Sequence, residues 1–360
     1  MALEGYPSLA TERDWQTVED GTVRFALVGL GWWTQEFVVP ALESASLASA
    51  TVAVSSSREK ADRLSSEVSS IETALIYEEF QEGEALDAYD AVYVCTPNAT
   101  HLEYVIAAAD HGKDVLCEKP MEATVERAER MTERCKGDDV TLMIAYRMHT
   151  EPVVRLARTV IERGLIGTPV LVRGQNAQPL LEMIDDPDQW RLDPDLSGYG
   201  TSVMDLGIYP LNTARFVLDS DPVRAQASMS SASEEFNEVP DERASFLVEF
   251  PENVVASCAA SQNAHKGDRF TVIGTEGELS MRDGFHSSDR RKLELARGGI
   301  RTAIDVEPVD QMTEEFDYFA DRVLRGERPH PDGEHGLVDM RALRAIYEAA
   351  ERDEPVAIEA

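Results

Sequence analysis

The chain has 360 residues, of which 43% are hydrophobic, and its 67 acidic and 34 basic residues give a formal net charge of −33. This length exceeds the ~100 to 200 residues of one typical domain, so we expect two folded domains rather than a disordered chain. A surface of this acidity repels phosphate backbones and anionic lipid, so we expect no nucleic-acid partner and no membrane partner.

Residues 1–22 carry no basic segment followed by an apolar core, and nowhere in the chain do ~18 apolar residues run together. We therefore expect a cytoplasmic protein whose residues 1–22 form an N-terminal extension, either an arm on a neighbouring subunit or a loose tail. The acidity, combined with only six lysines, favours a halophile, because molar salt screens charges beyond ~3 Å. An acidic protein of an ordinary cytosol is the alternative.

From residue 23 to 146, short apolar runs alternate with helical patterns, which is typical of a Rossmann domain with a doubly wound parallel sheet. In the second helical pattern, Thr100 and Glu103 predict a capping box, and Gly112 is placed to end the helix. The expected strands lie at 23–29, 51–54, 91–95, 115–117 and 141–145. The expected helices lie at 57–68, 100–112 and 124–135.

After residue 146 the pattern changes to strand-like runs joined by short turns, which predicts a substrate-binding α+β domain over 147–360 with a large, mostly antiparallel sheet. Helices are too few here to cover both faces of this sheet, so we expect its open face to pack on another subunit in a homodimer or homotetramer. The expected strands lie at 168–177, 243–250, 253–263 and 269–281. The expected helices lie at 151–164, 202–218, 312–326 and 338–352.

The four cysteines, Cys95, Cys117, Cys135 and Cys258, include no CxxC pair and no histidine at ligand spacing. Two of them end apolar runs, where a cysteine is usually a small buried hydrophobic residue. We therefore expect neither a metal site nor a disulfide framework.

The first strand leads into VGLGWWT (28–34), at the junction where a dinucleotide-binding turn opens a helix. Gly29 permits the tight turn, Gly31 lets the backbone approach a pyrophosphate, and the helix N-terminus supplies amide donors. Thr34 stands in place of the usual third glycine. An ordinary strand-to-helix turn is the alternative reading of the motif alone. The residues of this turn that we expect at the cofactor are Gly29, Leu30, Gly31, Trp32 and Trp33.

The end of the second strand lacks the acidic residue that binds the ribose 2′-hydroxyl of NAD. Hydroxyl and guanidinium donors suited to a 2′-phosphate stand there instead, so we expect NADP as the cofactor. A serine-rich turn that caps the following helix is the alternative. The residues expected at the 2′-phosphate are Ser55, Ser56, Ser57, Arg58 and Lys60.

CTPNATH (95–101) and CEKPM (117–121) follow the next two buried strands, and such carboxyl ends face the ligand crevice of a doubly wound sheet. Lys119 is therefore expected near the nicotinamide, in a loop that Pro120 fixes. A surface lysine is the alternative, but basic residues are scarce in this chain.

DLGIYPLN (205–212) places Asp205 and Tyr209 four residues apart, on one face of a helix, with Gly207 leaving room beside them. Taken alone, Tyr209 would be a core residue. Together with a lysine in the crevice it becomes a candidate acid/base.

These motifs, with AYRMHTEP (145–152), WRLDPDLSGYGTSVMDLGIYPLN (190–212) and VIGTEGEL (272–279), resemble the Gfo/Idh/MocA oxidoreductase family over about residues 23–358. Within the family the sugar dehydrogenases of haloarchaea and the glucose-fructose oxidoreductases are most similar. The resemblance implies NADP-dependent oxidation of a cyclic aldose, with D-xylose favoured, at C1 to the lactone.

The resemblance also places Lys119 and Tyr209 at the reacting centre. Relatives often carry histidine at the second of these positions, so the tyrosine indicates a sugar dehydrogenase. The further residues expected to bind the cofactor are Thr96, Pro97, Asn98, His101, Glu118, Lys119, Arg147, Trp190 and Arg191.

In the expected reaction Tyr209 takes the proton of the C1 hydroxyl while hydride passes from C1 to the nicotinamide. Free tyrosine is too weakly acidic to act as a base near neutral pH, and the ammonium of Lys119 would favour its phenolate form. Asp205 would orient Tyr209 or a sugar hydroxyl. The alternatives are an enzyme that retains NADP and couples two sugars, a reductase of another carbonyl, and a non-catalytic dinucleotide sensor, which would not need these three residues.

Overall fold

The computed structural model describes residues 13, 15, 17–286 and 291–359. The chain divides into two compact units. The parallel-sheet unit comprises Trp15–Arg147 and Asp310–Leu337, and the mixed-sheet unit comprises Met148–Val309 and Val338–Ala360. The segment Asp310–Leu337, which the sequence analysis assigned to the second domain, thus belongs to the unit of the parallel sheet.

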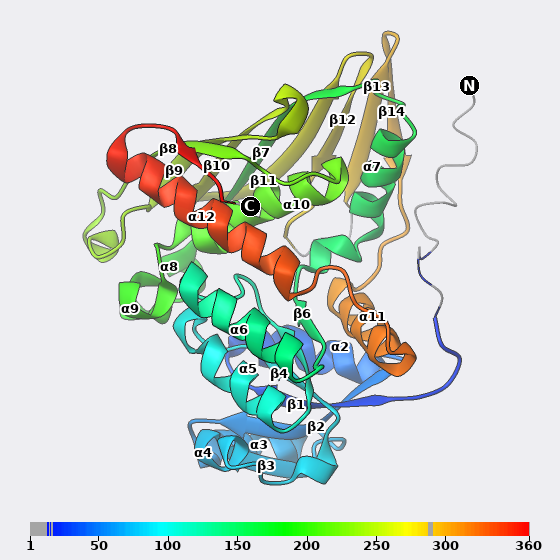
Figure 1. The fold of residues 1–360 in the computed structure, drawn as a ribbon, viewed down its shortest axis with the longest axis vertical. Helices are drawn as coiled ribbons and strands as arrows, with labels where there is room; N and C mark the ends of the chain where they lie inside the picture. The colour runs from blue at the N-terminus through cyan, green and yellow to red at the C-terminus, as the bar shows by residue number, and fades with distance from the viewer. Residues whose placement is uncertain (1–12, 14, 16, 287–290, 360) are drawn as a thin grey trace. The chain divides into compact units, whose positions relative to one another are not determined.

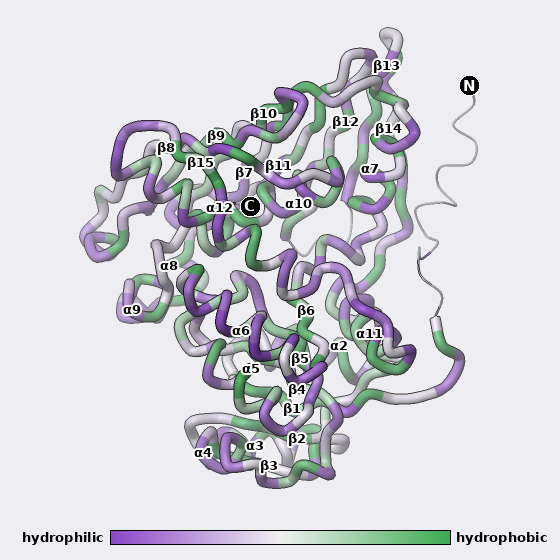
Figure 2. The backbone as a smooth tube through the Cα atoms, viewed as in Figure 1, coloured by the Kyte–Doolittle hydropathy of each residue, from purple (hydrophilic) through white to green (hydrophobic). Residues whose placement is uncertain are grey.

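The parallel-sheet unit contains six parallel strands in the order β3-β2-β1-β4-β5-β6, which is a doubly wound order. The expected strands are confirmed, and Figure 2 shows hydrophobic colouring along β1, β4 and β5. The edge strand β3 was not expected, because most of its residues are only partly buried and its apolar run is short. The strands are β1 (Val23–Val28), β2 (Ala48–Ser55), β3 (Thr73–Ile76), β4 (Ala91–Val94), β5 (Asp114–Cys117) and β6 (Leu142–Ile144).

Helices connect these strands, and the three expected ones are confirmed. The expected capping box is wrong: the Thr100 hydroxyl donates to the Pro97 carbonyl (2.8 Å), and the Glu103 carboxylate accepts from Arg127 (2.8 Å). Gly112 ends its helix with φ +65°, as expected. The helices of this unit are η1 (Thr34–Val38), α2 (Val39–Ser44), α3 (Arg58–Glu67), α4 (Tyr77–Gln81), η2 (Leu86–Ala88), η3 (Asn98–Thr100), α5 (His101–Asp110), α6 (Val125–Gly137) and α11 (Gln311–Arg325).

Helix α11 packs directly against the parallel sheet through aromatic side chains. The ring of Phe316 lies 5.1 Å from that of Phe25 on β1, edge to face, and Phe319 lies 5.6 Å from the same ring. The N-terminal extension meets this helix as well: the Val18 amide donates to Asp321 (2.7 Å) and Trp15 packs on Tyr318. Trp15 and Val18 are therefore bound within their own chain, while residues 1–12, 14 and 16 lie outside the described residues.

The mixed-sheet unit contains nine strands in the order β14-β13-β12-β11-β7-β10-β9-β8-β15. The expected antiparallel character is confirmed, with β7 and β10 as a parallel pair at the centre. Four strands were not expected, because their alternation of charged or small residues carries little hydrophobic pattern. The strands are β7 (Pro169–Pro179), β8 (Arg224–Ser230), β9 (Arg243–Glu249), β10 (Val255–Ser261), β11 (Asn263–Gly274), β12 (Gly277–Arg282), β13 (Lys292–Arg297), β14 (Ile300–Asp305) and β15 (Val356–Ala357).

Helices α7, α10 and α12 lie along one face of this sheet (Figure 1), and α10 contacts β7 and β10. The opposite face is open, so alternate residues of each strand are exposed, such as Arg173 on β7 and Leu247 on β9. Among the described residues, no helix is long and apolar enough to cross a membrane. The helices here are α7 (Pro152–Glu162), α8 (Leu180–Met183), η5 (Trp190–Leu192), α9 (Pro194–Ser197), η6 (Val203–Gly207), α10 (Ile208–Leu218), η7 (Glu234–Phe236), η8 (Pro251–Asn253) and α12 (Gly333–Arg352). The 3₁₀ helix η4 (Arg147–His149) follows β6.

Candidate active site

The turn after β1 has the form that a dinucleotide requires. Gly29 has φ +97°, and a Cβ at this position would lie 2.1 Å from the carbonyl oxygen of Cys95, so only glycine fits. A Cβ on Gly31 would meet no protein atom within 4 Å, which leaves the backbone open to a ligand. Thr34, which replaces the third glycine, is fully buried and its hydroxyl donates to the Gly29 carbonyl (2.7 Å). The threonine in place of the third glycine therefore stabilises the glycine turn.

Aromatic residues and an arginine lie next to this turn. Trp33 stacks on Phe37 with ring centroids 4.6 Å apart, while Trp32 is 52% exposed. The guanidinium of Arg147 lies over the ring of Trp33, 5.7 Å from its centroid, and also donates to Gln311 on α11. Arg147, Trp33 and the glycine turn thus belong to one unit, as a cofactor-side role requires.

The serine loop after β2 is held by its own hydrogen bonds. Ser55 is buried and its hydroxyl accepts from the amide of Ser57 (3.2 Å), whose own hydroxyl caps α3 by accepting from the Lys60 amide (3.3 Å). The guanidinium of Arg58 donates to the Ala74 carbonyl (2.6 Å) and to the carboxylate of Glu79. A 2′-phosphate would therefore compete with Glu79 for Arg58.

The loops after β4 and β5 are joined by the ring of His101, which is 1% exposed. Its Nδ1 faces the Met121 carbonyl (3.2 Å) and its Nε2 faces the Thr96 carbonyl (2.9 Å). Burial lowers the pKa of His101, and the two carbonyls oppose this effect. His101 therefore acts on the crevice by connecting the two loops, while Asn98 is buried in the first of them.

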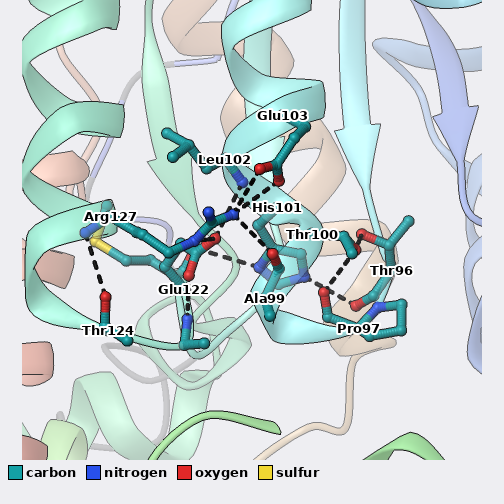
Figure 3. A network of polar contacts seen from close by, with 12 residues as sticks. Thr96, Pro97, Ala99, Thr100, His101, Leu102, Glu103, Glu122, Thr124 and Arg127 are labelled. Atoms are coloured by element: carbon teal, nitrogen blue, oxygen red, sulfur yellow. Dashed lines mark hydrogen bonds and ion pairs between the residues drawn. The ribbon is translucent and has the colours of Figure 1, made fainter. Parts of the chain in front are cut away.

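Two residues that the sequence analysis missed complete this connection (Figure 3). Glu122 is fully buried and accepts hydrogen bonds from Arg127 (2.8 Å) and from the Leu102 amide (3.3 Å). Arg127 also donates to the Ala99 carbonyl (2.7 Å) and to Glu103. Burial raises the pKa of Glu122, and Arg127 counteracts that rise. Glu122 and Arg127 thus connect the loop after β5 with the loop after β4. Their partners Leu102 and Ala99 lie 20 or more residues away in the sequence, so no motif indicates these contacts.

Lys119 follows a glutamate whose carboxylate is held on both sides. One oxygen of Glu118 accepts from the hydroxyl of Tyr93 on β4 (2.8 Å), and the other accepts from the backbone amide of Lys119 (3.0 Å). Pro120, after a cis peptide bond, is buried, and Lys119 is partly exposed. The hydrogen bonds of Glu118 thereby fix the backbone that carries the Lys119 side chain.

In the mixed-sheet unit, Asp205 lies on the π-helical turn η6. Its carboxylate accepts from the guanidinium of Arg191 (3.1 Å) and from the amide of Gln262 (2.8 Å). Gln262 in turn accepts from Gln178 (2.9 Å), and Arg191 stacks on Trp190, 4.4 Å from its ring centroid. Trp190 and Arg191, which we expected at the cofactor, are thus gathered around Asp205; Gln262 was not expected.

Tyr209 lies on α10, one residue into the helix that follows η6. Its ring is 5.7 Å from that of Phe285, and it is partly exposed. Gly207 brings the helix close to the sheet, because a Cβ there would lie 3.2 Å from the Phe246 ring. The expectation that Gly207 leaves room beside Asp205 and Tyr209 therefore needs correction: the space is taken by the sheet.

The buried carboxylate of Asp241 fixes the start of the π-helical turn η6. Asp241 accepts from the amides of Thr201 (2.7 Å) and Val203 (2.8 Å) and from the hydroxyl of Tyr347 (2.6 Å). Burial raises the pKa of Asp241 to about 6, against the hydrogen bonds, which lower it. Asp241 and Tyr347 thereby hold the turn of Asp205, and the sequence alone gave no indication of this.

The residues present fit a dinucleotide in the parallel-sheet unit, since Gly29 permits the tight turn and the backbone at Gly31 is open to a ligand. Among the described residues, no group of three or more histidine, cysteine, aspartate or glutamate side chains could hold a metal ion.

Cys117, Cys135 and Cys258 are buried, and burial raises the pKa of each thiol.

Sequence comparison identifies both parts of the chain. Residues 23–146 match the family model described as "Oxidoreductase family, NAD-binding Rossmann fold", and residues 154–280 match the "GFO/IDH/MocA C-terminal domain". D-xylose 1-dehydrogenase [NADP(+)] of Haloarcula marismortui is 53% identical over 96% of this chain and 97% of its own. D-xylose 1-dehydrogenase (NADP(+)) 2 of Haloferax volcanii is 31% identical over 91% of this chain and 97% of its own.

A solved structure has the same architecture. The aldose-aldose oxidoreductase from Caulobacter crescentus, complexed with glycerol, matches with a TM-score of 0.87 and 29% identity, over 93% of this chain and 99% of the other.

Proposed function

We propose that this chain, which belongs to the Gfo/Idh/MocA oxidoreductase family, oxidises D-xylose at C1 to the lactone with NADP. The observation that carries the substrate and the cofactor is the 53% identity to a D-xylose 1-dehydrogenase [NADP(+)] over nearly the whole of both chains. Lys119 and Tyr209, the residues that the resemblance places at the reacting centre, supply the acid/base chemistry that this reaction needs.

NADP, when bound, accepts the hydride from C1 of the sugar. Tyr209, as the phenolate, takes the proton of the C1 hydroxyl, so that the C1–O bond becomes the carbonyl of the lactone. Lys119 contributes a positive charge that favours the phenolate and bonds the developing alkoxide. The carboxylate of Glu118, which accepts from Tyr93 and from the Lys119 amide, fixes the backbone from which the lysine side chain extends.

Asp205 positions the sugar in this proposal. Its carboxylate accepts from Arg191, and we propose that it accepts a hydroxyl of the sugar as well. Gln262 fixes the orientation of the same carboxylate. Of the two roles expected for Asp205, we therefore favour binding of a sugar hydroxyl over orientation of Tyr209.

A screen of aldoses with NADP and with NAD, at molar KCl, tests the proposal by the absorbance of the reduced cofactor. D-xylose with NADP should give the highest kcat/KM. Equal rates for glucose and xylose would broaden the substrate class, and no reduction of either cofactor with any aldose would contradict the proposed activity.

A second function is favoured by the similarity to the aldose-aldose oxidoreductase. An enzyme of that kind would retain its NADP and transfer hydride from one sugar to another. The two functions differ in cofactor retention: gel filtration of the purified protein should remove NADP from a dehydrogenase, whereas tightly held NADP and activity with two sugars alone would favour the second function.

The 2′-phosphate preference is expected to depend on Arg58. Arg58→Ala should raise the KM for NADP by about fivefold at most, the range of an exposed ion contact, because Glu79 already competes for the guanidinium. The KM for NAD should remain nearly unchanged, since NAD has no 2′-phosphate. Glu79→Gln should have the opposite effect and lower the KM for NADP, because it frees Arg58 and can still accept from the Ile76 amide (3.0 Å).

Steady-state kinetics with both cofactors measures these changes. Arg63→Ala, which removes another exposed arginine of α3, is the matched control for net charge. If Arg58→Ala changed the KM of both cofactors equally, or if the wild type used NAD as well as NADP, the serine loop would have no role in phosphate recognition.

We place the protein in the cytoplasm of a halophile, on the basis of its acidity and of its similarity to two haloarchaeal relatives.

The protein is also expected to be a homo-oligomer that packs through the open face of the nine-stranded sheet. On this face Arg269 of β11 lies opposite Arg282 of β12, and Arg173 of β7 lies opposite Thr271. Like charges directly opposite each other are destabilising unless an anion neutralises them.

Among the described residues these three arginines have no acidic partner, although the chain as a whole carries a charge of −33. Glu278 and Glu294 lie on the same face and line a hollow of about 700 Å³ with the arginines. A second copy related by a two-fold axis could place its glutamates on these arginines and bury the exposed Leu171 and Leu247.

Light scattering at molar KCl should therefore give the mass of a dimer or a tetramer. Leu247→Asp, on the exposed side of β9, should reduce that mass, while Leu324→Asp, on an equally exposed leucine of α11, should not. A wild-type monomer would exclude this interface.

A further inference from the structure

Glu315 on α11 is a buried carboxyl group that has no hydrogen-bond partner in the part of the chain that the structure describes. Its side chain is 0% exposed, and among the described residues neither of its oxygens has a donor. Glutamate is almost never fully buried unless it is paired, and an apolar residue would be more favourable at this position. The polar group therefore calls for a reason other than packing.

Its surroundings contain two residues of the cofactor side. The ionisable groups that act on Glu315 are the carboxylate of Glu118, after β5, and the guanidinium of Arg147, after β6. Tyr93 on β4, which donates to Glu118, is likewise within electrostatic reach of Glu315. All four groups belong to the parallel-sheet unit.

The same helix also holds Arg147 directly. Gln311, one turn before Glu315 and on the same helical face, accepts a hydrogen bond from Arg147. Arg147 in turn lies over the ring of Trp33, beside the glycine turn. Helix α11 thus faces both Arg147 and Glu118 with two side chains, an amide and a carboxyl group.

Burial, followed by the negative charge of Glu118, raises the pKa of Glu315 well above its usual range, while Arg147 acts in the opposite direction. The neutral acid is therefore the form that the fold favours. Because the pKa of this acid is raised on folding, its contribution to stability is present at low pH and is lost as the pH rises through the raised value.

We propose that Glu315 is a positioning residue of the cofactor site, a neutral buried acid whose ionisation at alkaline pH loosens the grip of Arg147 and of the Glu118–Lys119 loop on the cofactor. Ionised Glu315 would repel the carboxylate of Glu118 and attract Arg147 away from Gln311 and Trp33. The loss of a proton at a site that does not touch the cofactor would thereby weaken its binding. The proposal rests on the assigned cofactor role of Arg147 and on the proposed reaction of Lys119.

Infrared difference spectroscopy tests the protonation of Glu315 without cofactor or sugar. The spectrum of wild type minus Glu315→Gln at neutral pH should contain the C=O stretch of a protonated carboxylic acid. Glu314→Gln, which changes the adjacent and partly exposed side chain of the same helix, is the matched control for the Glu315→Gln spectrum. A carboxylate band in the Glu315 difference spectrum would overturn the proposal.

The second measurement titrates NADP against tryptophan fluorescence between neutral and alkaline pH. The Kd of the wild type should rise by about fivefold or more across this range, the lower end of typical couplings between two sites. The Kd of Glu315→Gln should stay within about twofold and match the wild type at neutral pH. A pH dependence identical to that of the wild type, or weak binding at neutral pH, would show that Glu315 does not act as proposed.

Glu315→Met, an apolar side chain of similar length, decides the same question if the glutamine variant does not fold. Its Kd for NADP should also lose the alkaline rise. Neither measurement uses a sugar, so a failure to oxidise any aldose would contradict the proposed function and leave this test intact.

Discussion

Lys119→Ala and Tyr209→Phe should each lower kcat for D-xylose by ~10²- to 10⁴-fold, the range for removal of an acid/base group. Tyr209→Phe removes the oxygen that accepts the proton, and Lys119→Ala removes the charge that favours the phenolate. NADP binding, measured by fluorescence, should persist in both variants. The double variant should be little slower than the poorer single one, because the two residues act as a unit.

Two matched variants control for general damage to the protein. Lys136→Ala removes an exposed lysine that pairs with Glu334, and Tyr199→Phe removes a hydroxyl from the mixed-sheet unit. Both should retain turnover near that of the wild type. Near-normal turnover in Lys119→Ala or in Tyr209→Phe would remove that residue from the mechanism.

The fold was predictable where hydrophobic periodicity is strong. The buried strands of the parallel sheet, such as Val23–Val28 and Ala91–Val94, are short and mostly apolar runs, which is the pattern of strands covered on both faces. The edge strands β3 and β14 were missed, because they present few apolar residues to a core, whereas the edge strand β6 was predicted. The position of α11 was also not predictable, since nothing in its periodicity indicates which of two sheets it packs against.

The candidate site was predictable to the extent that its chemistry follows strand ends. The glycine turn and Lys119 are examples, because the carboxyl ends of parallel strands determine where a ligand binds. The supporting residues were not predictable. Glu122 accepts a hydrogen bond from Arg127, and no motif marks this pair. Asp241 accepts from Tyr347, which lies more than 100 residues away in the sequence. Arg58 was expected at the 2′-phosphate and stays a prediction, but its pairing with Glu79, 21 residues further along the chain, could not be predicted.

Transfer from molar KCl to ~0.1 M KCl should destabilise the protein strongly. The Debye length then grows from ~3 Å to ~10 Å, so that carboxylates which are independent at high salt repel one another across the surface. The 34 basic residues offset only part of the 67 acidic ones, so a net charge of −33 remains to repel itself. Each kcal/mol lost lowers the Tm of a domain of this size by ~2 to 4 °C, and we expect a total fall of about 10 °C or more.

Thermal unfolding followed by circular dichroism at both salt concentrations measures this fall, and sucrose at matched osmolality is the control. Sucrose stabilises folded proteins by exclusion from their surface but screens no charge, so it should not restore the Tm at low salt. Restoration by sucrose would assign the effect of KCl to solute exclusion rather than to screening. An unchanged Tm in dilute buffer would refute the halophilic interpretation, because the acidic surface would then be stable without salt to screen it.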